Sequence, residues 1–285
     1  MQRPGLLRSM IVALFALCVF HPFTSAAELS KDDVDFRKNV FVNKKGEHLP
    51  YRLYVPTGYS RAQKYPLIFW LHGGGGRGTD NVLQISRNDA KGTHFWVDPE
   101  SQRMFPAFVF VPQCPMNEMW ADPELNQPSK PLLLSIEALG AIQKEFSIDP
   151  DRIYLAGQSI GGLGVWALMQ LYPERWAAAL VLSAFDNFTN TDALVQVPVW
   201  VFQGDADRNV PVDLVRQMMK QLKKLHANYR YTEYHRADHD VWNLAFSEPD
   251  LIPWLSSQKR GQPYLPGPAS GGKGQVGSSA SPPIH

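Results

Sequence analysis

The chain has 285 residues, of which 44% are hydrophobic, and a formal net charge of +1 at neutral pH. This size and composition are ordinary for a globular protein, and one large hydrophobic core is the simplest interpretation. The near-zero net charge, without a long basic block or a basic amphipathic helix, argues against nucleic acid and anionic membranes as partners. We therefore expect no nucleic-acid partner and no stable membrane association.

The first 27 residues have the pattern of a secretory signal peptide. Arg3 and Arg8 supply its positive start, Met10 to Phe20 its apolar middle, and Ser25 to Ala27 a cleavage site of small residues. A single membrane anchor is the alternative, but the apolar stretch is short for a helix that must cross a bilayer. We predict that residues 1–27 are removed and that the mature protein is secreted or periplasmic.

Residues 28–258 are expected to form one folded domain, and residues 259–285 a disordered tail. The tail is rich in glycine, proline and serine and has no apolar periodicity. Cleavage of the signal peptide would remove Cys18 and leave Cys114 as the only cysteine, so we expect no intramolecular disulfide. A domain of this size can be stable through its hydrophobic core alone.

The start of the domain predicts an antiparallel hairpin at a sheet edge. Two runs of β-branched and aromatic residues, Val40 to Val42 and Leu49 to Val55, flank a polar turn. Later apolar runs, bounded by turn residues, predict strands that are covered on both faces, as in a parallel sheet. These strands are expected at Pro66–Leu71, Phe105–Val111, Arg152–Ala156, Ala178–Leu182 and Val197–Phe202, with a further strand at Tyr229–Tyr234.

Helices are predicted between these strands. Apolar residues recur at helical spacing from Leu132 to Phe146, and Gly162 to Tyr172 and Val212 to His226 also fit helices. The alternation predicts an α/β fold with a mostly parallel central sheet, helices on both faces and the hairpin at one edge. The polar stretch Ser86 to Arg103 is expected to be either a loop over a pocket or an ordinary surface excursion.

A glycine-rich segment, His72 to Asn81, follows the strand at Pro66–Leu71. A flexible linker is one interpretation, but it would not be expected directly after a buried strand. In an oxyanion loop, glycines let the backbone approach a substrate and turn an N–H group toward the carbonyl oxygen. We predict such a loop, with Gly74 as the donor. A phosphate-binding loop would need a Gly-Lys-Ser/Thr ending, which this segment lacks.

A Gly-x-Ser-x-Gly motif, Gly157 to Gly161, ends the strand that begins at Arg152. In a nucleophile elbow the serine lies on a strained turn, and glycines flank it because the chain passes too close for a side chain. The motif alone also occurs by chance, but here a strand precedes it and a helix follows it. We therefore predict that Ser159 is a nucleophile, with the N-terminus of the helix behind it.

A serine nucleophile needs a histidine as general base and a carboxylate that orients the histidine. In an α/β sheet these side chains are expected on loops at the carboxyl ends of separate strands. Asp205 and Asp207 both follow the strand at Val197–Phe202. We favour Asp207, which opens the turn, over Asp205, which lies next to the strand end; the other aspartate would be a turn former.

Three histidines compete for the role of base. His239 lies in a polar loop past the strand at Tyr229–Tyr234, whereas His235 closes that strand and His226 ends a helix. We therefore predict His239. His235 and His239 could suggest a metal pair, but their spacing at a strand end is not that of helical ligands, and we expect no metal. The order serine, aspartate, histidine is that of α/β-hydrolases.

In combination these motifs resemble the bacterial α/β-hydrolase esterases of the phospholipase/carboxylesterase or polyhydroxybutyrate-depolymerase-like type. These enzymes are related to dienelactone hydrolases and to feruloyl and acetylxylan esterases. The resemblance covers residues 48–258, through Leu71–Asn81, Pro112–Trp120, Asp149–Tyr154, Gly157–Gly162, Gly204–Pro211 and His239–Trp242. Relatives often have alanine and glutamate where this chain has Gly74 to Gly76, so Arg77 lacks an expected carboxylate partner.

The resemblance implies an α/β-hydrolase catalytic domain that hydrolyses carboxylic esters without a metal or an organic cofactor. Matched motif by motif, it implies Ser159 as the nucleophile, Asp207 as the acid and His239 as the base. The backbone N–H groups of Gly74 and Ile160 would form the oxyanion hole.

The substrate prediction depends on the insertions near the expected site, which are short and polar and lack the large apolar lid of a lipase. We expect Trp120, Gln158 and His72 to contact the substrate. Further rings and polar groups that could hold a sugar or an aromatic acyl group are His94, Phe95, Trp96 and Phe185. The predicted substrates are short-acyl or hydroxycinnamoyl esters, either small molecules or linked to a polysaccharide.

Other functions remain open at this point. One is a generalist carboxylesterase or polyester depolymerase, and another is a serine peptidase of the prolyl-oligopeptidase type. That peptidase would normally carry a gating domain, which the residues between Glu28 and His48 are too few to supply. A non-catalytic binding protein on a hydrolase scaffold would be expected to have lost a triad member.

Overall fold

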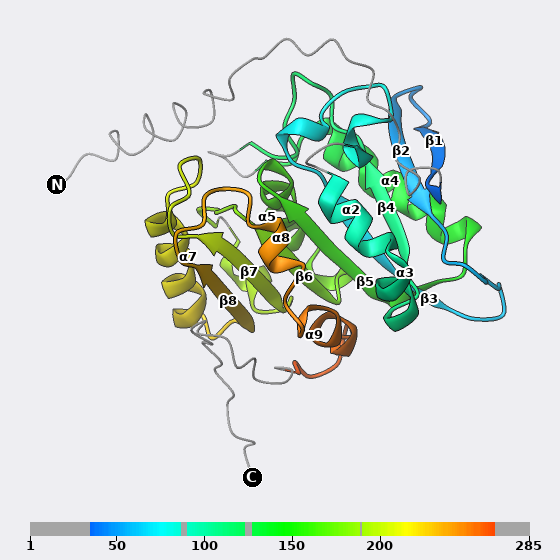
Figure 1. Ribbon diagram of the computed structural model, residues 1–285. Coiled ribbons are helices and arrows are strands. Elements are labelled where there is room, and N and C mark those ends of the chain that lie inside the picture. The colour runs from blue at the N-terminus through cyan, green and yellow to red at the C-terminus, as the bar shows by residue number, and fades with distance from the viewer. Residues whose placement is uncertain (1–34, 87–89, 123–126, 189, 266–285) are drawn as a thin grey trace.

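The computed structural model describes residues 35–86, 90–122, 127–188 and 190–265. Over these residues the chain forms one eight-stranded sheet, in the order β1-β2-β4-β3-β5-β6-β7-β8 (Figure 1). The predicted signal peptide, residues 1–27, lies outside the described residues, as does the end of the predicted tail, residues 266–285.

The sheet is antiparallel at one edge and parallel elsewhere. Strand β1 pairs with β2, and β2 with β4, in antiparallel register, whereas the strands from β4 to β8 in the sheet order are parallel. The predicted α/β-hydrolase sheet with an N-terminal hairpin is therefore confirmed. The strands are β1 (Arg37–Val42), β2 (His48–Tyr54), β3 (Tyr65–Leu71), β4 (Phe108–Pro112), β5 (Ile148–Gln158), β6 (Ala178–Leu182), β7 (Val199–Gly204) and β8 (Tyr229–Tyr234).

Two hydrophobic clusters lie on the two faces of the sheet, because successive strand residues point to opposite sides. In β3, Leu67, Phe69 and Leu71 join one cluster, while Ile68 and Trp70 join the other. Buried side chains of α4 (Lys130–Glu145), α5 (Ile160–Leu171), α6 (Thr191–Leu194) and α7 (Val212–Lys224) belong to the first cluster. The second cluster includes side chains of α2 (Ala90–Val97), α8 (Trp242–Ala245) and α9 (Leu251–Ser257).

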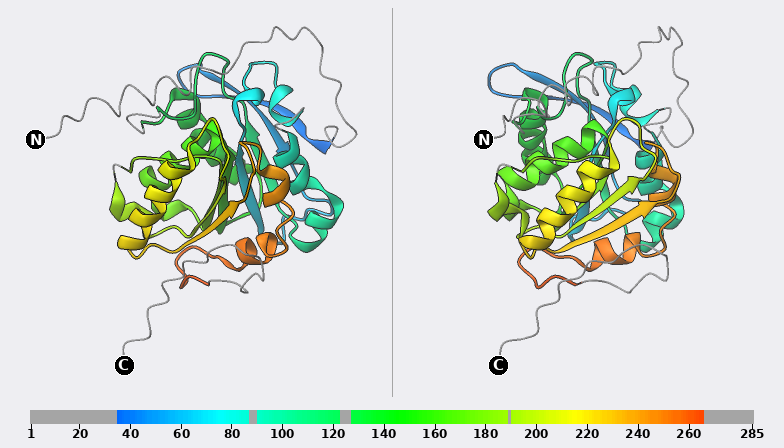
Figure 2. Two further views of the ribbon diagram at one scale, coloured as in Figure 1. Left: turned by 60° about the vertical axis from the view of Figure 1, so that its left-hand side comes forward. Right: turned by 90° about the vertical axis from the view of Figure 1, so that its left-hand side faces the viewer.

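This arrangement gives three layers, with helices on both faces of the sheet (Figures 1 and 2). A short helix, α3 (Pro99–Met104), follows α2, and 3₁₀ turns form η2 (Gly74–Gly76), η3 (Leu83–Ile85) and η5 (Pro173–Arg175). None of the helices within the described ranges is long and apolar enough to span a lipid bilayer.

The stretch from Ser86 to Arg103, expected to be a loop, is largely helical where it is described. Helix α2 packs so closely on the sheet that a Cβ added to Gly92 would lie 2.0 Å from the ring of Trp70. Trp96 is buried and Phe95 stacks on Phe246, with ring centroids 4.7 Å apart. These rings are therefore part of the core packing and do not form a substrate surface. The sequence pattern did not predict this helix because glycine, threonine and aromatic residues have low helix propensity. Tertiary packing overrides that low propensity here.

The start of the predicted tail, Lys259 to Leu265, packs on the domain. The Arg260 N–H donates a hydrogen bond to the Asp151 carbonyl oxygen (2.9 Å), and its guanidinium pairs with the Asp151 carboxylate. The buried Gln258 side chain donates to the Leu265 carbonyl (2.6 Å) and accepts from its N–H (3.3 Å). The domain therefore extends to at least Leu265 and not only to Gln258. These contacts are polar, so apolar periodicity could not reveal them.

Truncation after Gln258 is expected to lower the thermal midpoint by about 2–4 °C relative to a chain that ends at Leu265. Once the conformational entropy of ordering the segment is subtracted, the lost contacts are worth a net of about 1 kcal/mol, which corresponds to such a shift in a domain of this size. Differential scanning calorimetry of the two truncated chains measures the effect. Equal midpoints would show that this segment does not stabilise the domain.

Candidate active site

The serine of the Gly-x-Ser-x-Gly motif lies between β5 and α5 in a strained conformation, with φ 53° and ψ −123°. A Cβ added to Gly161 would lie 2.0 Å from the Leu71 carbonyl oxygen, and one added to Gly157 would lie 2.6 Å from the Gly161 oxygen. Only glycine fits at these two positions. The packing therefore forces the sharp turn that holds Ser159 at the carboxyl edge of the sheet.

A chain of hydrogen bonds joins three loops at this edge. His239 Nε2 lies 2.9 Å from Ser159 Oγ, and His239 Nδ1 lies 2.9 Å from Asp207 Oδ2. Since an ionised carboxylate only accepts, Nδ1 carries the proton and Nε2 is free to accept the proton of the serine hydroxyl. The Asp207 carboxylate is fully buried, whereas the imidazole is 17% exposed. The three side chains follow β5, β7 and β8, as the sequence order predicts.

The Asp207 carboxylate is held by four donors. Its Oδ1 accepts from the N–H groups of Asn209 and Val210, both at 2.8 Å. Its Oδ2 accepts from His239 Nδ1 and from Gln203 Nε2, the latter at 2.9 Å. Sequence reasoning missed Gln203. The available signal was a polar side chain at the end of the apolar strand β7, four residues before the aspartate.

Asp205, the competing aspartate, is directed to the surface. Its carboxylate accepts hydrogen bonds from His235 Nδ1 (2.8 Å) and from the Arg236 N–H (2.6 Å). The His235 hydrogen bond lowers the pKa of Asp205 below its ordinary value. His235 and His239 thus contact different aspartates. Among the residues that the structure describes, no group of three histidine, cysteine or acidic side chains could hold a metal ion.

The backbone of the histidine loop is fixed by side chains that the sequence analysis did not single out. The Ser183 hydroxyl, just past β6, donates to the His239 carbonyl oxygen (2.7 Å), and Asp238 Oδ1 accepts from the His239 N–H (2.8 Å). The ring of Trp242 meets the imidazole edge to face, with centroids 5.6 Å apart. His239 is therefore held at both its backbone and its ring.

The two expected oxyanion donors open helical turns. Gly74 is the first residue of η2 and Ile160 the first residue of α5. The first N–H groups of a helix have no acceptor within that helix, so both are available to a ligand. Gly74 also lies in open space, since a Cβ added there would meet only the Arg77 guanidinium at 3.9 Å.

The glycine loop is held without the glutamate that relatives often have. Arg77 Nε donates to the Gly74 carbonyl oxygen (3.1 Å), so the guanidinium contacts the loop itself. Gln113 Nε2 donates to the Gly76 carbonyl (3.2 Å) and to Asp80 Oδ1 (2.7 Å), while its Oε1 accepts from the Asn81 N–H (2.6 Å). A neutral amide just after β4 therefore ties the middle of the loop, at Gly76, to its end at Asp80 and Asn81.

His72, which was expected to contact the substrate, is fully buried below this loop. Its Nε2 accepts from the Cys114 N–H (3.0 Å), so the proton lies on Nδ1, which donates to the Gly73 carbonyl (2.7 Å). Burial lowers the pKa of His72 to about 4, because it disfavours the charged ring. His72 is therefore a neutral structural side chain, and its assignment to substrate contact is corrected.

The other two expected substrate contacts are also buried. Trp120 donates from Nε1 to the His72 carbonyl oxygen (3.1 Å), and its side chain fills the space beside Gly164. Gln158 is 1% exposed and precedes the serine on the strand. Phe185, a further ring proposed for the pocket, is 5% exposed and belongs to the first core cluster. These side chains are buried and offer almost no surface to a substrate in this conformation.

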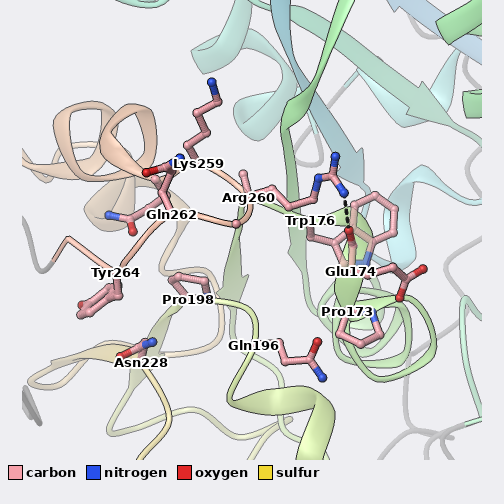
Figure 3. Close-up of a pocket in the computed structure, with 13 residues that line it drawn as sticks. Pro173, Glu174, Trp176, Gln196, Pro198, Asn228, Lys259, Arg260, Gln262 and Tyr264 are labelled. Atoms are coloured by element: carbon pink, nitrogen blue, oxygen red, sulfur yellow. Dashed lines mark hydrogen bonds between the residues drawn. The ribbon is translucent and has the colours of Figure 1, made fainter. Parts of the chain in front are cut away.

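A cavity of about 420 Å³ lies at the opposite edge of the sheet. Its walls include Pro198 and Asn228, which directly precede the parallel strands β7 and β8, whereas the serine, aspartate and histidine follow strand ends. Lys259 to Gln262 close one side, where Arg260 donates to the Glu174 carbonyl oxygen (3.1 Å; Figure 3). The length of the strands places this cavity roughly 20 Å from Ser159, so it is separate from the candidate active site.

Comparison with known proteins identifies the fold. The family model of the alpha/beta hydrolase fold matches residues 147–253, which include the serine, the aspartate and the histidine. The chain has the α/β-hydrolase fold. The predicted resemblance to α/β-hydrolase esterases is also confirmed, since the relatives described next are esterases by name.

A thermostable esterase of known structure is 36% identical to this chain and superposes with a TM-score of 0.76, over 80% of this chain and 64% of that one. Probable feruloyl esterase C of Aspergillus terreus is 31% identical over 133 residues, which are 47% of this chain and 45% of the relative. A ferulic acid esterase structure is 16% identical, with a TM-score of 0.60, and shares the fold alone. The chain thus matches less than half of the curated relative and 64% of the thermostable esterase.

Replacement of Asp207 by Asn is expected to lower ester turnover by roughly ten-thousand-fold, because an amide would favour the wrong imidazole tautomer. Asp205→Asn is the matched control, since it removes a neighbouring carboxylate that faces His235. That variant should retain turnover within a fewfold of the wild type. Steady-state kinetics on a chromogenic ester measures both, and the reverse ranking would refute the assignment.

The burial of His72 predicts a pH dependence of stability. Its folded pKa of about 4 lies below the ordinary value near 6.5, so as the pH falls through this window the unfolded chain binds a proton that the folded protein does not. Titration of His72 therefore destabilises the folded protein on acidification, by roughly 2 kcal/mol between pH 7 and pH 4.5. The variant His72→Gln should be less stable than the wild type at pH 7, but the difference should narrow at pH 4.5. Urea unfolding at both pH values measures this, and a constant difference would contradict it.

Proposed function

We propose that this protein is an exported serine carboxylic-ester hydrolase that acts through an acyl-enzyme. The observation that carries the proposal is the continuous hydrogen-bond chain from Ser159 Oγ through His239 to Asp207, with 2.9 Å at each step. The esterase names of the relatives support the reaction class. Export is supported by the signal-peptide pattern of residues 1–27.

In the proposed mechanism, His239 Nε2 takes the proton of the Ser159 hydroxyl as Oγ attacks the ester carbonyl carbon. The carbonyl oxygen becomes an oxyanion that the N–H groups of Ile160 and Gly74 stabilise, with the N-terminus of α5 behind them. His239 then gives its proton to the departing alkoxide as the carbon–oxygen bond breaks, which leaves the acyl group on the serine.

Water completes the cycle: it now acts as the nucleophile, and Ser159 becomes the leaving group. His239 takes a proton from the water as its oxygen attacks the acyl carbon, and returns that proton to Ser159 Oγ when the acid leaves. Throughout, the buried Asp207 carboxylate stabilises the imidazolium and keeps Nδ1 protonated. The mechanism uses only side chains and backbone groups of this chain and requires no metal or organic cofactor.

The proposed substrates are short-acyl or hydroxycinnamoyl esters, either small or linked to a polysaccharide. Similarity to a probable feruloyl esterase supports the hydroxycinnamoyl class. The aromatic side chains that first suggested this class do not support it, because Trp96, Trp120 and Phe185 are buried. The alternative, a generalist carboxylesterase or polyester depolymerase, shares the same triad and differs only in the acyl groups it accepts.

The proposal predicts turnover of acetyl, butyryl or feruloyl model esters, with Ser159→Ala lowering it by several orders of magnitude. A chromogenic panel with acetyl, butyryl, octanoyl and feruloyl groups measures the acyl preference. Peptide anilides in the same assay test the peptidase alternative.

Each outcome of this panel decides a different part of the proposal. Retention of activity by folded Ser159→Ala would overturn the nucleophile. A rate that peaks at octanoyl would rule out the short-acyl class, and activity on simple acetyl and butyryl esters alone would favour the generalist. Cleavage of peptide anilides in preference to esters would replace the esterase by a peptidase.

A further inference from the structure

One buried amide contacts the candidate triad, although it takes no part in the mechanism above. Gln203 is the penultimate residue of β7 and is fully buried. Its Nε2 lies 2.9 Å from Asp207 Oδ2, 3.0 Å from the Val210 carbonyl oxygen and 3.3 Å from the Gly204 carbonyl oxygen. This single group therefore lies between the triad carboxylate and the backbone of the loop that carries it.

The contacts fix the orientation of this amide. All three neighbours of Nε2 are acceptors, and the reversed amide would place an oxygen against three oxygens. Gln203 Oε1 lies on the other side, where it has no hydrogen-bond partner among the described residues. The fold thus leaves Gln203 Oε1 buried without a partner while Gln203 Nε2 faces the Asp207 carboxylate. This orientation indicates that the N–H donor is the part of the side chain that position 203 requires.

The two oxygens of Asp207 are held in different ways. Backbone N–H groups of Asn209 and Val210 hold Oδ1, and they belong to the same turn as the aspartate itself. Oδ2, the oxygen that accepts from His239, has Gln203 as its other donor. With Oδ1 acting as a hinge, the Gln203 hydrogen bond determines the plane of the carboxylate and therefore the direction in which Oδ2 faces the imidazole.

We infer that Gln203 is a positioning residue of the triad, which aims Asp207 Oδ2 at His239 Nδ1 and moderates the proton affinity of the pair. This inference rests on the proposed function. A donor on Oδ2 withdraws part of the negative charge that would otherwise stabilise the imidazolium. It also prevents rotation of the carboxylate away from the imidazole during the reaction.

Four other side chains of these two loops form two contacts, and Arg236 and Asp240 are exposed. Asp205 contacts His235 at 2.8 Å, and Asp238 Oδ2 lies 3.6 Å from Arg208 Nε. In each pair one side chain, His235 or Arg208, is largely exposed, so solvent screens the interaction. The donors on Asp207 itself are therefore the main local control on the charge of the carboxylate and the imidazole.

The test is Gln203→Met, which keeps the length of the side chain and removes the donor. The kcat for a chromogenic ester should fall roughly ten- to a hundredfold with KM unchanged, because a hydrogen bond to a charged group is lost. The acidic limb of kcat/KM should move to higher pH, because the Asp207–His239 pair with one donor fewer binds its proton more tightly. An organophosphate that phosphorylates the serine stoichiometrically counts active sites, so each kcat refers to folded enzyme.

The matched control is Gln102→Met, which removes another buried glutamine amide. Gln102 Nε2 donates to the carbonyl oxygens of Trp96 (2.7 Å) and Ala107 (3.1 Å) in the second core cluster. This variant should lose stability and keep the wild-type pH profile and kcat per active site. If Gln203→Met, like the control, keeps both the wild-type pH profile and the wild-type kcat per active site, Gln203 has only a structural role and the inference is overturned.

A double-mutant cycle tests whether Gln203 acts through the aspartate. In the background of Asp207→Asn, Gln203→Met should cause little further loss of kcat, because the carboxylate that it aims is gone. If Gln203→Met lowers kcat by the same factor in the wild-type protein and in the Asp207→Asn variant, the inference is overturned. Retention of activity by Ser159→Ala would instead overturn the proposed function, so the two failures are distinguishable.

If Gln203→Met does not fold, the wild-type protein still gives an answer by NMR. The side-chain amide resonances of Gln203 should shift over the same pH range as the acidic limb of kcat/KM, because the amide donates to the oxygen that contacts the titrating pair. The amide of Gln102 serves as the internal reference. A Gln203 amide that does not respond in this range would overturn the inference.

Discussion

The close approach of the first turn of α5 to the end of β3 is the constraint on which the site depends. At Gly161 the helix touches the Leu71 and His72 carbonyl oxygens, where an added Cβ would lie 2.0 Å and 2.8 Å away. This contact places the N-terminus of α5 directly beside the start of the glycine loop. Ser159 and the loop therefore cannot move independently, and the two candidate oxyanion donors are held at a fixed spacing before any substrate binds.

The strain at Ser159 follows from the same packing. A non-glycine residue at positive φ costs of order 1–3 kcal/mol and persists only where its surroundings leave no alternative. Here the Ser159 N–H donates to the Leu182 carbonyl oxygen (2.9 Å), and Gly162 fits against Ala184, where a Cβ would lie 2.4 Å from the alanine methyl. Strands β3 and β6, on the two sides of β5, thus enclose the turn and keep the hydroxyl outside the sheet edge.

The sequence predicted the sheet and the three triad positions because both depend on local signals. An apolar run, a Gly-x-Ser-x-Gly and the order of polar loops after strands are visible in one chain. The failures concern tertiary burial. His72 follows β3 and Trp120 lies in the segment after β4, in two separate motifs beside the site. Whether such side chains face the substrate or the core depends on how closely β3, β4 and α5 pack.

Gln203 was missed for a related reason. An amide has no reactivity that would single it out in a sequence, and its importance comes only from a 2.9 Å contact to Asp207. The polar groups that support the site, Gln203, Gln113 and His72, are all neutral when buried. A neutral dipole costs far less to bury than a charge, so such groups can hold a loop or a carboxylate without needing a counter-ion of their own.

A second buried carboxylate, Asp186, can be compared with Asp207 because it has fewer hydrogen-bond donors. Asp186 lies in the loop after β6, at the same sheet edge as Asp207, and accepts from the Phe188 N–H (2.5 Å) and from Gln170 Nε2 (3.3 Å). Burial outweighs these hydrogen bonds and raises its pKa to about 6. A carboxyl that gains a proton near pH 6 stabilises an imidazolium poorly, and its donors turn it toward α5. Asp207 differs from Asp186 in both respects that matter for a triad. The turn after β7, with Gln203 beneath it, gives Asp207 four donors, and one of its oxygens faces the histidine.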